Sequence, residues 1–425
     1  MKKFLSLLLI LSSTLCFAQK TYIQCGKLID VNEGKTLSEM TIVTEGSKII
    51  DVLKGHQSGT STDKIIDLKN KTVLPGLIDC HVHLELQYSR NQLVEGFTSN
   101  KADVAFRSTV FANKTLMAGF TTVRDLGGSG VNIALRKAVD KGEVVGPHIL
   151  TCGIAISATG GHGDPTHGLS EEIFPEPAQP KDGVADGKDE IVKAIRLQFK
   201  NGADVIKIAS TGGVLDLSKD GSGAQYSIDE IKAAVKTAKD YGMKVACHAH
   251  GAEGIKRAII GGVASIEHGT FMDAEGMELA KKNGTYLVPT ITAGKSVADS
   301  AKIPGFFPPV IARKALEVGP VIQNTFAKAY KAGVKIAFGT DAGVFAHGKN
   351  AKEFIYMTEV GMTPMEAIQS ATKNAADLLG ITAIAGSIEK GKTADIIAVD
   401  GDPIKNISLL QNVVFVMKSG SIFKQ

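Results

Sequence analysis

The stretch 74–83, which reads LPGLIDCHVH, carries the clearest candidates for chemistry in the sequence. An apolar run with a Pro-Gly corner ends in His81 and His83. Residues i and i+2 of an extended strand point to the same face, so both imidazoles would project from one strand end. Such a pair can hold one divalent metal ion, most commonly zinc. Two ordinary buried histidines explain an isolated pair about as well, so the interpretation depends on further ligands.

Four later strand-like runs contain or precede residues that can bind a metal or carry protons. One of these residues is a lysine inside an apolar run, where burial is costly and lowers the pKa of the amine. An ion-paired lysine is the ordinary explanation, and each motif alone is weak. A purely structural role does not explain five strands that all supply such residues. The additional residues are Lys207, His248, His250, His268 and Asp341.

The middle of the chain alternates strand-like and helix-like patterns, which indicates a parallel α/β sheet. Eight such units predict a closed (β/α)8 TIM barrel, whose active site lies at the carboxyl ends of the strands. Residues 165–188 are expected to form a long loop over that face, and 291–334 a helical excursion. The predicted strands are 77–83, 121–125, 148–153, 204–209, 244–248, 265–268, 285–289 and 335–340.

Both ends of the chain are rich in short strands punctuated by Gly and Asn, without helical periodicity. They predict one small β-sandwich domain built from both termini. The expected domains are a signal peptide at 1–18, the first part of the sandwich at 19–74, the barrel at 75–375 and the second part of the sandwich at 376–425.

Residues 1–18 have the composition of a cleaved signal peptide. Two lysines precede an apolar run that is too short to span a bilayer, and Ala18 ends a small-residue cleavage site. Leu15 stands where a lipoprotein signal needs a small residue before Cys16, so lipidation ranks second. We expect an exported protein, periplasmic or secreted, without a stable membrane span.

The charge and cysteine content narrow the classes of partner. The two lysines are the only charged residues of the signal segment, so its removal lowers the formal charge from +4 to +2. A near-neutral chain of this kind is not expected to bind nucleic acid. The remaining cysteines show no Cys-x-x-Cys spacing, and we favour buried thiols over a disulfide, which export would permit. They are Cys25, Cys80, Cys152 and Cys247.

Taken together, the motifs resemble the amidohydrolase superfamily over nearly the whole mature chain. The resemblance rests on PGLIDCHVH at 75–83, Lys207, the two downstream histidines, GTD at 339–341 and GKTADI at 391–396. More closely, STGGV at 210–214, QYS at 225–227 and HGKN at 347–350 resemble the imidazolonepropionase-related branch. Members of that branch with a lysine on the fourth strand include zinc dipeptidases that cleave Xaa-Pro or Xaa-Arg/Lys bonds.

The resemblance implies two divalent metal ions, with zinc the favoured identity. Lys207 would be carboxylated and bridge the metals, which explains its burial. Asp341 would also act as general acid–base catalyst. The first metal would be held by His81, His83 and Asp341, and the second by His248 and His268.

Four other residues are weaker candidates for contact with a small-molecule or dipeptide substrate. His162 follows the third strand and could bind the substrate carbonyl, and Tyr226 could stabilise a developing oxyanion. His250 could face the site beside His248, and His347 could meet a substrate terminus. Arg124 is expected to form a local ion pair.

Two rival interpretations remain open. A mononuclear deaminase or imidazolonepropionase-like hydrolase would share the fold and act on a cyclic amide or heterocycle. Lys207 argues against it, since a single metal needs no bridging ligand. A non-catalytic periplasmic metal-binding protein is the second rival, and the aspartate beside a His-x-His site argues against it. The substrate side chain and the association of chains into a homo-oligomer are not determined by the sequence.

Overall fold

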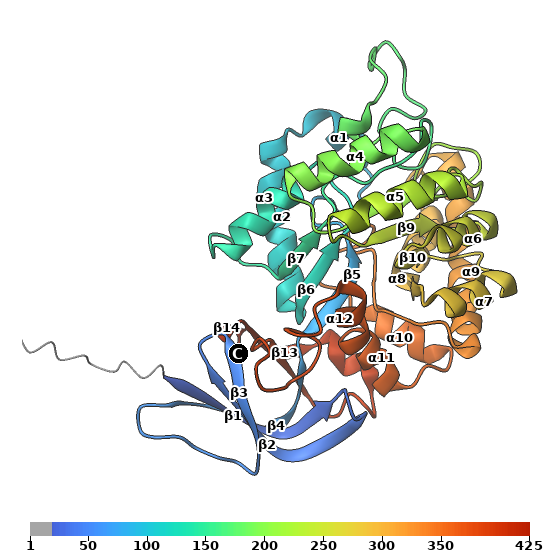
Figure 1. Ribbon diagram of the computed structural model, residues 1–425. Helices are drawn as coiled ribbons and strands as arrows, with labels where there is room; N and C mark the ends of the chain where they lie inside the picture. Colours follow the sequence, from blue (N-terminus) through green and yellow to red (C-terminus); the bar gives the residue numbers. More distant parts are fainter. Residues whose placement is uncertain (1–18) are drawn as a thin grey trace, which may run out of the picture.

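The computed structural model describes residues 19–425, so the predicted signal peptide lies outside the described part of the chain. The fold is α/β, as expected. Figure 1 shows an α/β part that carries most of the helices, with the terminal strands gathered beneath it. No helix in the described residues is long and apolar enough to cross a membrane.

Two parallel sheets form the core of the α/β part. One has the order β5-β6-β7 and the other the order β11-β10-β9-β8, and every neighbouring pair is parallel. Most of their residues are buried, as expected when helices cover a parallel sheet. The strands are β5 (Leu77–Val82), β6 (Phe120–Asp125), β7 (His148–Thr151), β8 (Ile206–Ala209), β9 (Val245–Ala249), β10 (Ser265–His268) and β11 (Tyr286–Val288).

Backbone bridges connect the two sheets at both edges. Ile156, just after β7, pairs with Ile208 of β8. At the other edge, Leu287 of β11 pairs with Ile336, and Val82 of β5 pairs with Ala342. The segment between these bridges therefore lies where an eighth strand would be.

The prediction of a regular strand at 335–340 is wrong. The segment makes only isolated bridges, and two of its amides bind partners outside the neighbouring strands. Phe338 N donates to the carbonyl of Ser370, and Thr340 N donates to the carboxylate of Asp79. The other seven predicted strands are confirmed, with ends that shift by a few residues.

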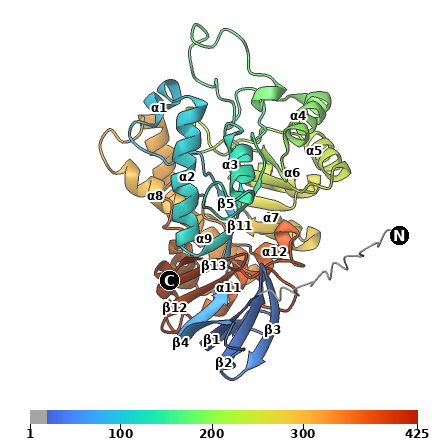
Figure 2. The same ribbon diagram turned by 90° about the vertical axis from the view of Figure 1, so that its left-hand side faces the viewer.

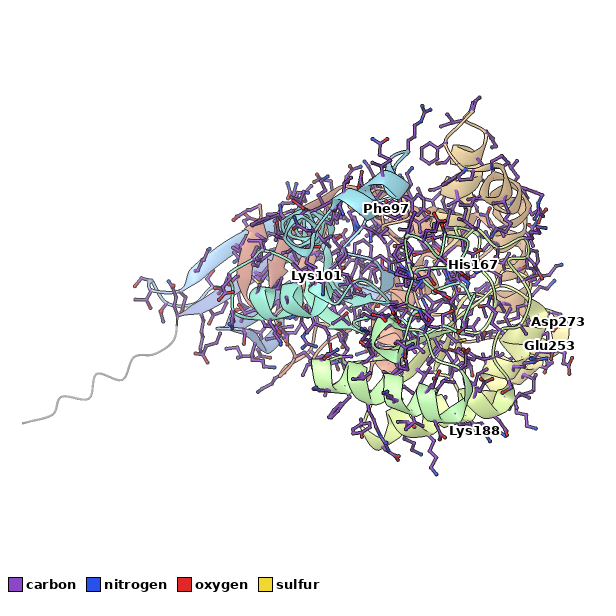
Figure 3. The ribbon with its side chains drawn as sticks, turned by 90° about the horizontal axis from the view of Figure 1, so that it is seen from above. Phe97, Lys101, His167, Lys188, Glu253 and Asp273 are labelled. Carbon is purple, nitrogen blue, oxygen red and sulfur yellow. The ribbon has the colours of Figure 1, made fainter. Side chains whose placement is uncertain are left out.

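Helices surround the parallel sheets, and Figure 3 shows Lys188 of α4, Glu253 of α6 and Asp273 before α7 at the outer rim. Helix α5 begins with a capping box between Ser227 and Glu230. The helices are α1 (Gln92–Thr98), α2 (Lys101–Met117), α3 (Val131–Asp140), α4 (Gly187–Asn201), α5 (Ile228–Asp240), α6 (Ala252–Gly261), α7 (Ala274–Asn283), α8 (Ile291–Ala301), α9 (Pro309–Ala332), α10 (Lys352–Glu359), α11 (Pro364–Ser370) and α12 (Lys373–Leu379), with short 3-10 turns at Pro180–Asp182 and Ile407–Gln411.

Strands from both chain ends join in one sheet, as the sequence predicts (Figure 2). Its order is β14-β13-β12-β4-β1-β2-β3, so its hydrogen bonds form one seven-stranded sheet. A division into two facing layers, as in a sandwich, stays a prediction. The strands are β1 (Lys20–Asp30), β2 (Lys35–Glu45), β3 (Lys48–Lys54), β4 (Lys64–Pro75), β12 (Ile396–Asp400), β13 (Val413–Lys418) and β14 (Ser421–Lys424).

Gly76 links this terminal sheet to the first strand of the α/β part. β4 ends at Pro75 and β5 begins at Leu77. A Cβ atom at Gly76 would lie 2.1 Å from Oγ1 of Thr121 on β6, so only glycine fits there. The terminal sheet thereby fixes the start of β5, which contains His81 and leads directly into His83.

The four cysteines among residues 19–425 are buried and unpaired, which confirms the prediction of free thiols. Burial raises the pKa of each thiol, to about 12 for Cys25 and Cys247. Such thiols stay protonated and unreactive at neutral pH.

Candidate metal centre

A cavity of about 720 Å³ opens at the carboxyl ends of the parallel strands. Eight of the ten sequence-predicted site residues line it, although they come from segments up to 260 residues apart. Tyr226 and His347 are absent from its described lining. The eight residues are His81, His83, His162, Lys207, His248, His250, His268 and Asp341.

His81, His83 and Asp341 form the first ligand group, with candidate ligand atoms within 4.8 Å of one another. Asp341 Oδ1 lies 3.2 Å from His83 Nε2 and 3.5 Å from His81 Nε2. His81 Nε2 and Asp341 Oδ1 are buried and have no hydrogen-bond partner among the described residues. Unpaired buried polar atoms are costly, and a cation between these atoms would satisfy them. The group therefore fits a divalent metal.

In each histidine of this group, the Nδ1 atom makes a hydrogen bond on the side of the ring away from the ligand atom Nε2. His81 Nδ1 donates to Glu267 Oε2 (2.9 Å), and His83 Nδ1 donates to the carbonyl of Gly127 (2.9 Å). These bonds place the proton on Nδ1 and leave Nε2 for a ligand, as in histidine metal sites. Burial and the nearby charge of Lys207 lower the pKa of His81 to about 4, so its ring is neutral and able to coordinate.

A buried ion pair anchors Glu267. Arg124 Nη2 lies 2.9 Å from Glu267 Oε1, and both side chains are at most 1% exposed. Despite burial, which raises it, the charge of Arg124 and the bond from His81 lower the pKa of Glu267 to about 2. Arg124 forms an ion pair as expected, but the partner is 143 residues along the chain and not a local one. This partner, Glu267, is a supporting residue that sequence reasoning missed.

Asp79 is a second supporting residue that sequence reasoning missed. Its carboxylate accepts hydrogen bonds from Thr340 N (3.1 Å), Thr340 Oγ1 (2.6 Å) and Asn350 Nδ2 (2.8 Å). It thus fixes the turn in which Asp341 adopts the left-handed conformation, with φ of 60°. Non-glycine residues rarely adopt this conformation, and such strain is typical of functional sites.

His248, His250 and His268 form the second ligand group, again with atoms within 4.8 Å. His250 Nδ1 is hydrogen-bonded to Thr270 Oγ1 (2.7 Å), and His268 Nδ1 to Thr290 Oγ1 (2.8 Å). His248 instead donates from Nε2 to the carbonyl of Gly212 (3.1 Å), which leaves its Nδ1 free for a ligand. The sequence assigns His250 to substrate contact, and the geometry also places it within reach of a metal held by the other two.

Lys207 lies in the same cavity and is 5% exposed. Burial lowers the pKa of its amine. Within residues 19–425, its Nζ has no recorded hydrogen bond or ion pair, and its charge lowers the pKa of histidines in both ligand groups. This is the environment in which a neutral amine is favoured over an ammonium.

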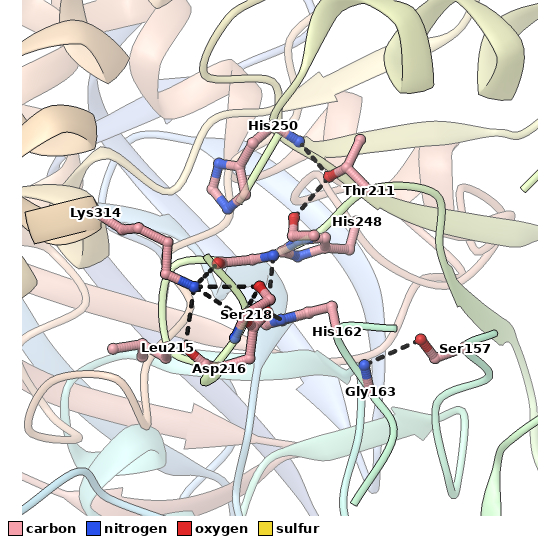
Figure 4. A network of polar contacts seen from close by, with 12 residues as sticks. Ser157, His162, Gly163, Thr211, Leu215, Asp216, Ser218, His248, His250 and Lys314 are labelled. Atoms are coloured by element: carbon pink, nitrogen blue, oxygen red, sulfur yellow. Dashed lines mark hydrogen bonds and ion pairs between the residues drawn. The ribbon is translucent and has the colours of Figure 1, made fainter. Parts of the chain in front are cut away.

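The remaining candidates differ in position. His162 lies in the cavity, stacks on His248 at 4.1 Å and binds Asp216 through Nδ1 (2.7 Å), as Figure 4 shows. The Tyr226 hydroxyl donates to the carbonyl of Ala185 (2.9 Å) inside the core, so an oxyanion role has no support in this geometry.

His347 lies behind the cavity wall rather than in it. Its Nε2 donates to the carbonyl of Leu86 (3.0 Å), and its ring stacks on Phe111 at 4.6 Å. Because Leu86 lines the cavity, His347 supports the wall. A direct contact between His347 and a substrate terminus has no support in this placement.

The cavity has one apolar side. Its carboxylates among the described residues are Asp341 in the first ligand group and Asp182, which caps a 3-10 turn. Lys101 and Lys181 are exposed at the lining. The apolar side is formed by α8 and α9 together with two loops, one after β8 and one after residue 340. Its residues are Val214, Leu215, Val297, Val318, Ile322 and Val344.

Comparisons with known proteins agree with the resemblance. Residues 72–423 match the model of the amidohydrolase family. Ochratoxinase of Aspergillus niger is 33% identical over 425 residues, which cover 92% of this chain and 83% of that protein. Imidazolonepropionase of Fusobacterium nucleatum is 26% identical over 398 residues, which cover 84% of each chain.

Solved structures are similar over almost the full length. A Xaa-Pro dipeptidase with methionine bound in its active site is 50% identical, with a TM-score of 0.93 over 96% of this chain and 100% of that one. A prolidase complexed with N-methylphosphonate-L-proline is 32% identical, with a TM-score of 0.87 over 96% and 100% of the two chains. The cavity described above therefore lies in a chain whose relatives are hydrolases of amide bonds.

Proposed function

This chain belongs to the amidohydrolase family, a hydrolase of carbon–nitrogen amide bonds, and we propose that it is an exported, binuclear metal-dependent dipeptidase. The single observation that carries the proposal is the placement of Lys207 in one cavity with two separate ligand groups. A mononuclear site has no use for a buried lysine at this position. The second ligand group would be equally unexplained.

The proposed metal ligands follow the two groups. His81, His83 and Asp341 would hold one ion, and His248 and His268 the other, with Lys207 carboxylated as the bridge. Carboxylation turns the buried cation into an anion with two ligand oxygens. The bound ions, which we propose to be zinc, would supply Lewis acidity to the scissile carbonyl and to the attacking water.

Asp341 would move the protons of the reaction. Its Oδ1 is one of the two ligand-group atoms that lack a hydrogen-bond partner in the described structure. In the proposed reaction it takes a proton from the attacking water and passes it to the nitrogen of the leaving amine. The C–N bond breaks, and a free amino acid leaves as the amine product.

The walls of the cavity favour a substrate with an apolar group. The side formed by α8 and α9 has no charged residue in the described lining, so burying an Arg or Lys side chain there would leave a cation without a partner. An aliphatic side chain or a proline ring fits that side. We therefore place Xaa-Pro dipeptides, and related N-acyl amino acids, ahead of Xaa-Arg and Xaa-Lys.

The finer features of the fold belong to the same proposal. We infer that the two parallel sheets and the bridged segment 335–342 make up the (β/α)8 barrel over 75–375, supported by the bridges at both edges. The terminal sheet would be its β-sandwich partner, over 19–74 and 376–425. Cleavage after Ala18 would deliver the protein to the periplasm or the medium.

A panel of dipeptides tests the function. The mature protein, loaded with zinc, should release proline from Leu-Pro and Met-Pro, detected as free amino acid. Asp-Pro, Lys-Pro, Leu-Arg and Leu-Lys should react more slowly. Absence of peptide hydrolysis, together with turnover of a cyclic amide or an aminated heterocycle, would refute the dipeptidase and favour the imidazolonepropionase-like alternative.

A further inference from the structure

Lys314 of α9 is a lysine of the helical excursion that is 3% exposed yet fully paired. Its Nζ lies 2.7 Å from Asp216 Oδ1 and donates to the carbonyl oxygens of Gly213 (2.7 Å) and Asp216 (2.9 Å). All three protons of the ammonium thus have acceptors, as a buried charge requires. The pair ties α9 to the loop 212–218 after β8, as drawn in Figure 4.

Asp216 also contacts His162, a residue that lines the cavity. Its second oxygen, Oδ2, accepts from His162 Nδ1 (2.7 Å) and from Gly213 N (2.9 Å). Burial alone would raise the pKa of Asp216, but the bonds from His162 and Lys314 hold it well below its usual range. The carboxylate is therefore anionic at neutral pH and can only accept, so His162 Nδ1 must carry the proton.

The loop 212–218 is shaped to receive the His162 ring. A Cβ atom at Gly213 would lie 1.9 Å from His162 Nδ1, so a side chain there would displace the imidazole. One face of the ring stacks on His248, with an angle of 19° between the two rings. His248 in turn donates to the carbonyl of Gly212. One loop therefore supports two histidines of the cavity.

We propose that Asp216 and Lys314 are positioning residues that hold His162 in one orientation and one tautomer, with Nδ1 protonated and Nε2 directed to the substrate. The inference rests on the proposed function. In this tautomer Nε2 carries no proton, so it accepts a hydrogen bond from an N–H group of the dipeptide substrate and does not donate one to the carbonyl. Lys314 itself does not line the cavity. The excursion 291–334 thus acts on the reaction through a residue that never touches the substrate.

A double-mutant cycle on the metal-loaded protein tests the proposal. Lys314→Met should lower kcat/KM for Leu-Pro by about 10- to 100-fold, the cost of a misplaced contact, with metal content unchanged. In a His162→Ala background the same change should cost little more, because the two residues act as one unit. Lys314→Arg should recover part of the loss.

A matched control separates positioning from general damage. Lys418 of β13, in the terminal sheet, is another buried lysine, 9% exposed, and lies outside the lining of the cavity. It donates to the carbonyl of Gly146 (2.6 Å). Lys418→Met should leave kcat/KM unchanged even if it lowers Tm.

If Lys314→Met fails to fold, Asp216→Asn serves as the second variant, since an amide can turn its NH2 group toward His162.

The tautomer is also measurable without turnover. Long-range 1H–15N spectra, with His162 assigned from His162→Asn, should show one Nδ1-protonated ring in the wild type and a mixture in Lys314→Met. A protein that hydrolyses no dipeptide but shows these spectra refutes the proposed function and supports the positioning. Independent, multiplying effects on kcat/KM, or an unchanged tautomer in Lys314→Met, would overturn the inference.

Discussion

Lys207 is the residue that separates a binuclear centre from a mononuclear one. Its amine is buried, has a lowered pKa and lies in one cavity with both ligand groups. An unmodified ammonium there would repel bound metal ions, whereas a carbamate would attract them. In the proposed centre, its chemical state would thus determine how many metal ions the cavity can hold.

Replacement of Lys207 by alanine is therefore expected to remove the metal pair and the activity together. A short carboxylic acid added to Lys207→Ala should restore part of both, because it can occupy the position of the bridge. Elemental analysis and dipeptide hydrolysis report the two quantities on the same sample. A variant that binds two metals and turns over normally would make Lys207 a structural lysine.

Asp341 has two proposed roles, metal binding and proton transfer. Replacing its carboxylate by an amide distinguishes the two. Asp341→Asn keeps the shape of the side chain and the support from Thr340 and Asp79. It should retain much of the metal but lose roughly 10²–10⁴-fold in kcat, the usual contribution of general acid–base catalysis. Near wild-type kcat at full metal content would remove Asp341 from proton transfer.

Glu267 should matter for metal affinity although it does not line the cavity. It holds the Nδ1 proton of His81, and supporting groups of this kind typically contribute about 10- to 100-fold in metal affinity. Glu267→Gln should weaken one metal site by that amount in a competition titration with a chelator. Equal affinities in wild type and variant would show that Arg124 and the fold alone orient His81.

At the scale of elements, α8 and α9 are expected to set substrate preference. The two helices pack closely through glycines, since a Cβ atom at Gly319 would lie 2.3 Å from Ala298. Val297 of α8 lines the cavity on this apolar side. Val297→Asp should therefore shift the ratio of kcat/KM from Leu-Pro toward substrates with a Lys or Arg side chain.

Val297→Asn is the matched control, because asparagine has the same shape as aspartate. It removes the apolar surface as Val297→Asp does, but it adds no charge. It should lower kcat/KM for Leu-Pro without favouring cationic substrates. Identical specificity of both variants and the wild type would place the substrate side chain elsewhere in the cavity.

The sequence predicts the strand ends well and the supporting residues poorly. His81, Lys207, His268 and Asp341 could be found because strand period and apolar runs place them at one edge of a sheet. Tyr226 illustrates the limit, since its hydroxyl turns into the core toward a carbonyl 41 residues earlier in the chain. Such pairings depend on loop paths, which have no local sequence pattern.

The wrong prediction of an eighth strand and the missed supporting residues have a related cause. The pattern at 335–340 is strand-like, but two of its amides bind Asp79 and a helix-end carbonyl, so a regular ladder does not form. Asp216 and Lys314 lie 98 residues apart and meet only because α9 returns over the loop after β8. Long-range polar pairs of this kind need the three-dimensional structure.

At the scale of the whole molecule, the proposed signal-peptide cleavage site lies directly before the first strand of the terminal sheet. Residue 19 immediately precedes β1, so cleavage after Ala18 would leave all strands of the sheet intact. Mass spectrometry of protein recovered from the periplasm or medium should give a chain that begins at Gln19. An uncleaved chain in the cytoplasm, or a lipid on Cys16, would contradict this prediction.

The number of metal ions needed for hydrolysis tests the central claim most directly. Metal-free mature protein is titrated with zinc in the presence of bicarbonate, and proline release from Leu-Pro is followed at each step. We expect activity to rise until two equivalents are bound and to be lost again on chelation. Full activity at one equivalent, or hydrolysis that survives complete removal of metal, would contradict the binuclear dipeptidase.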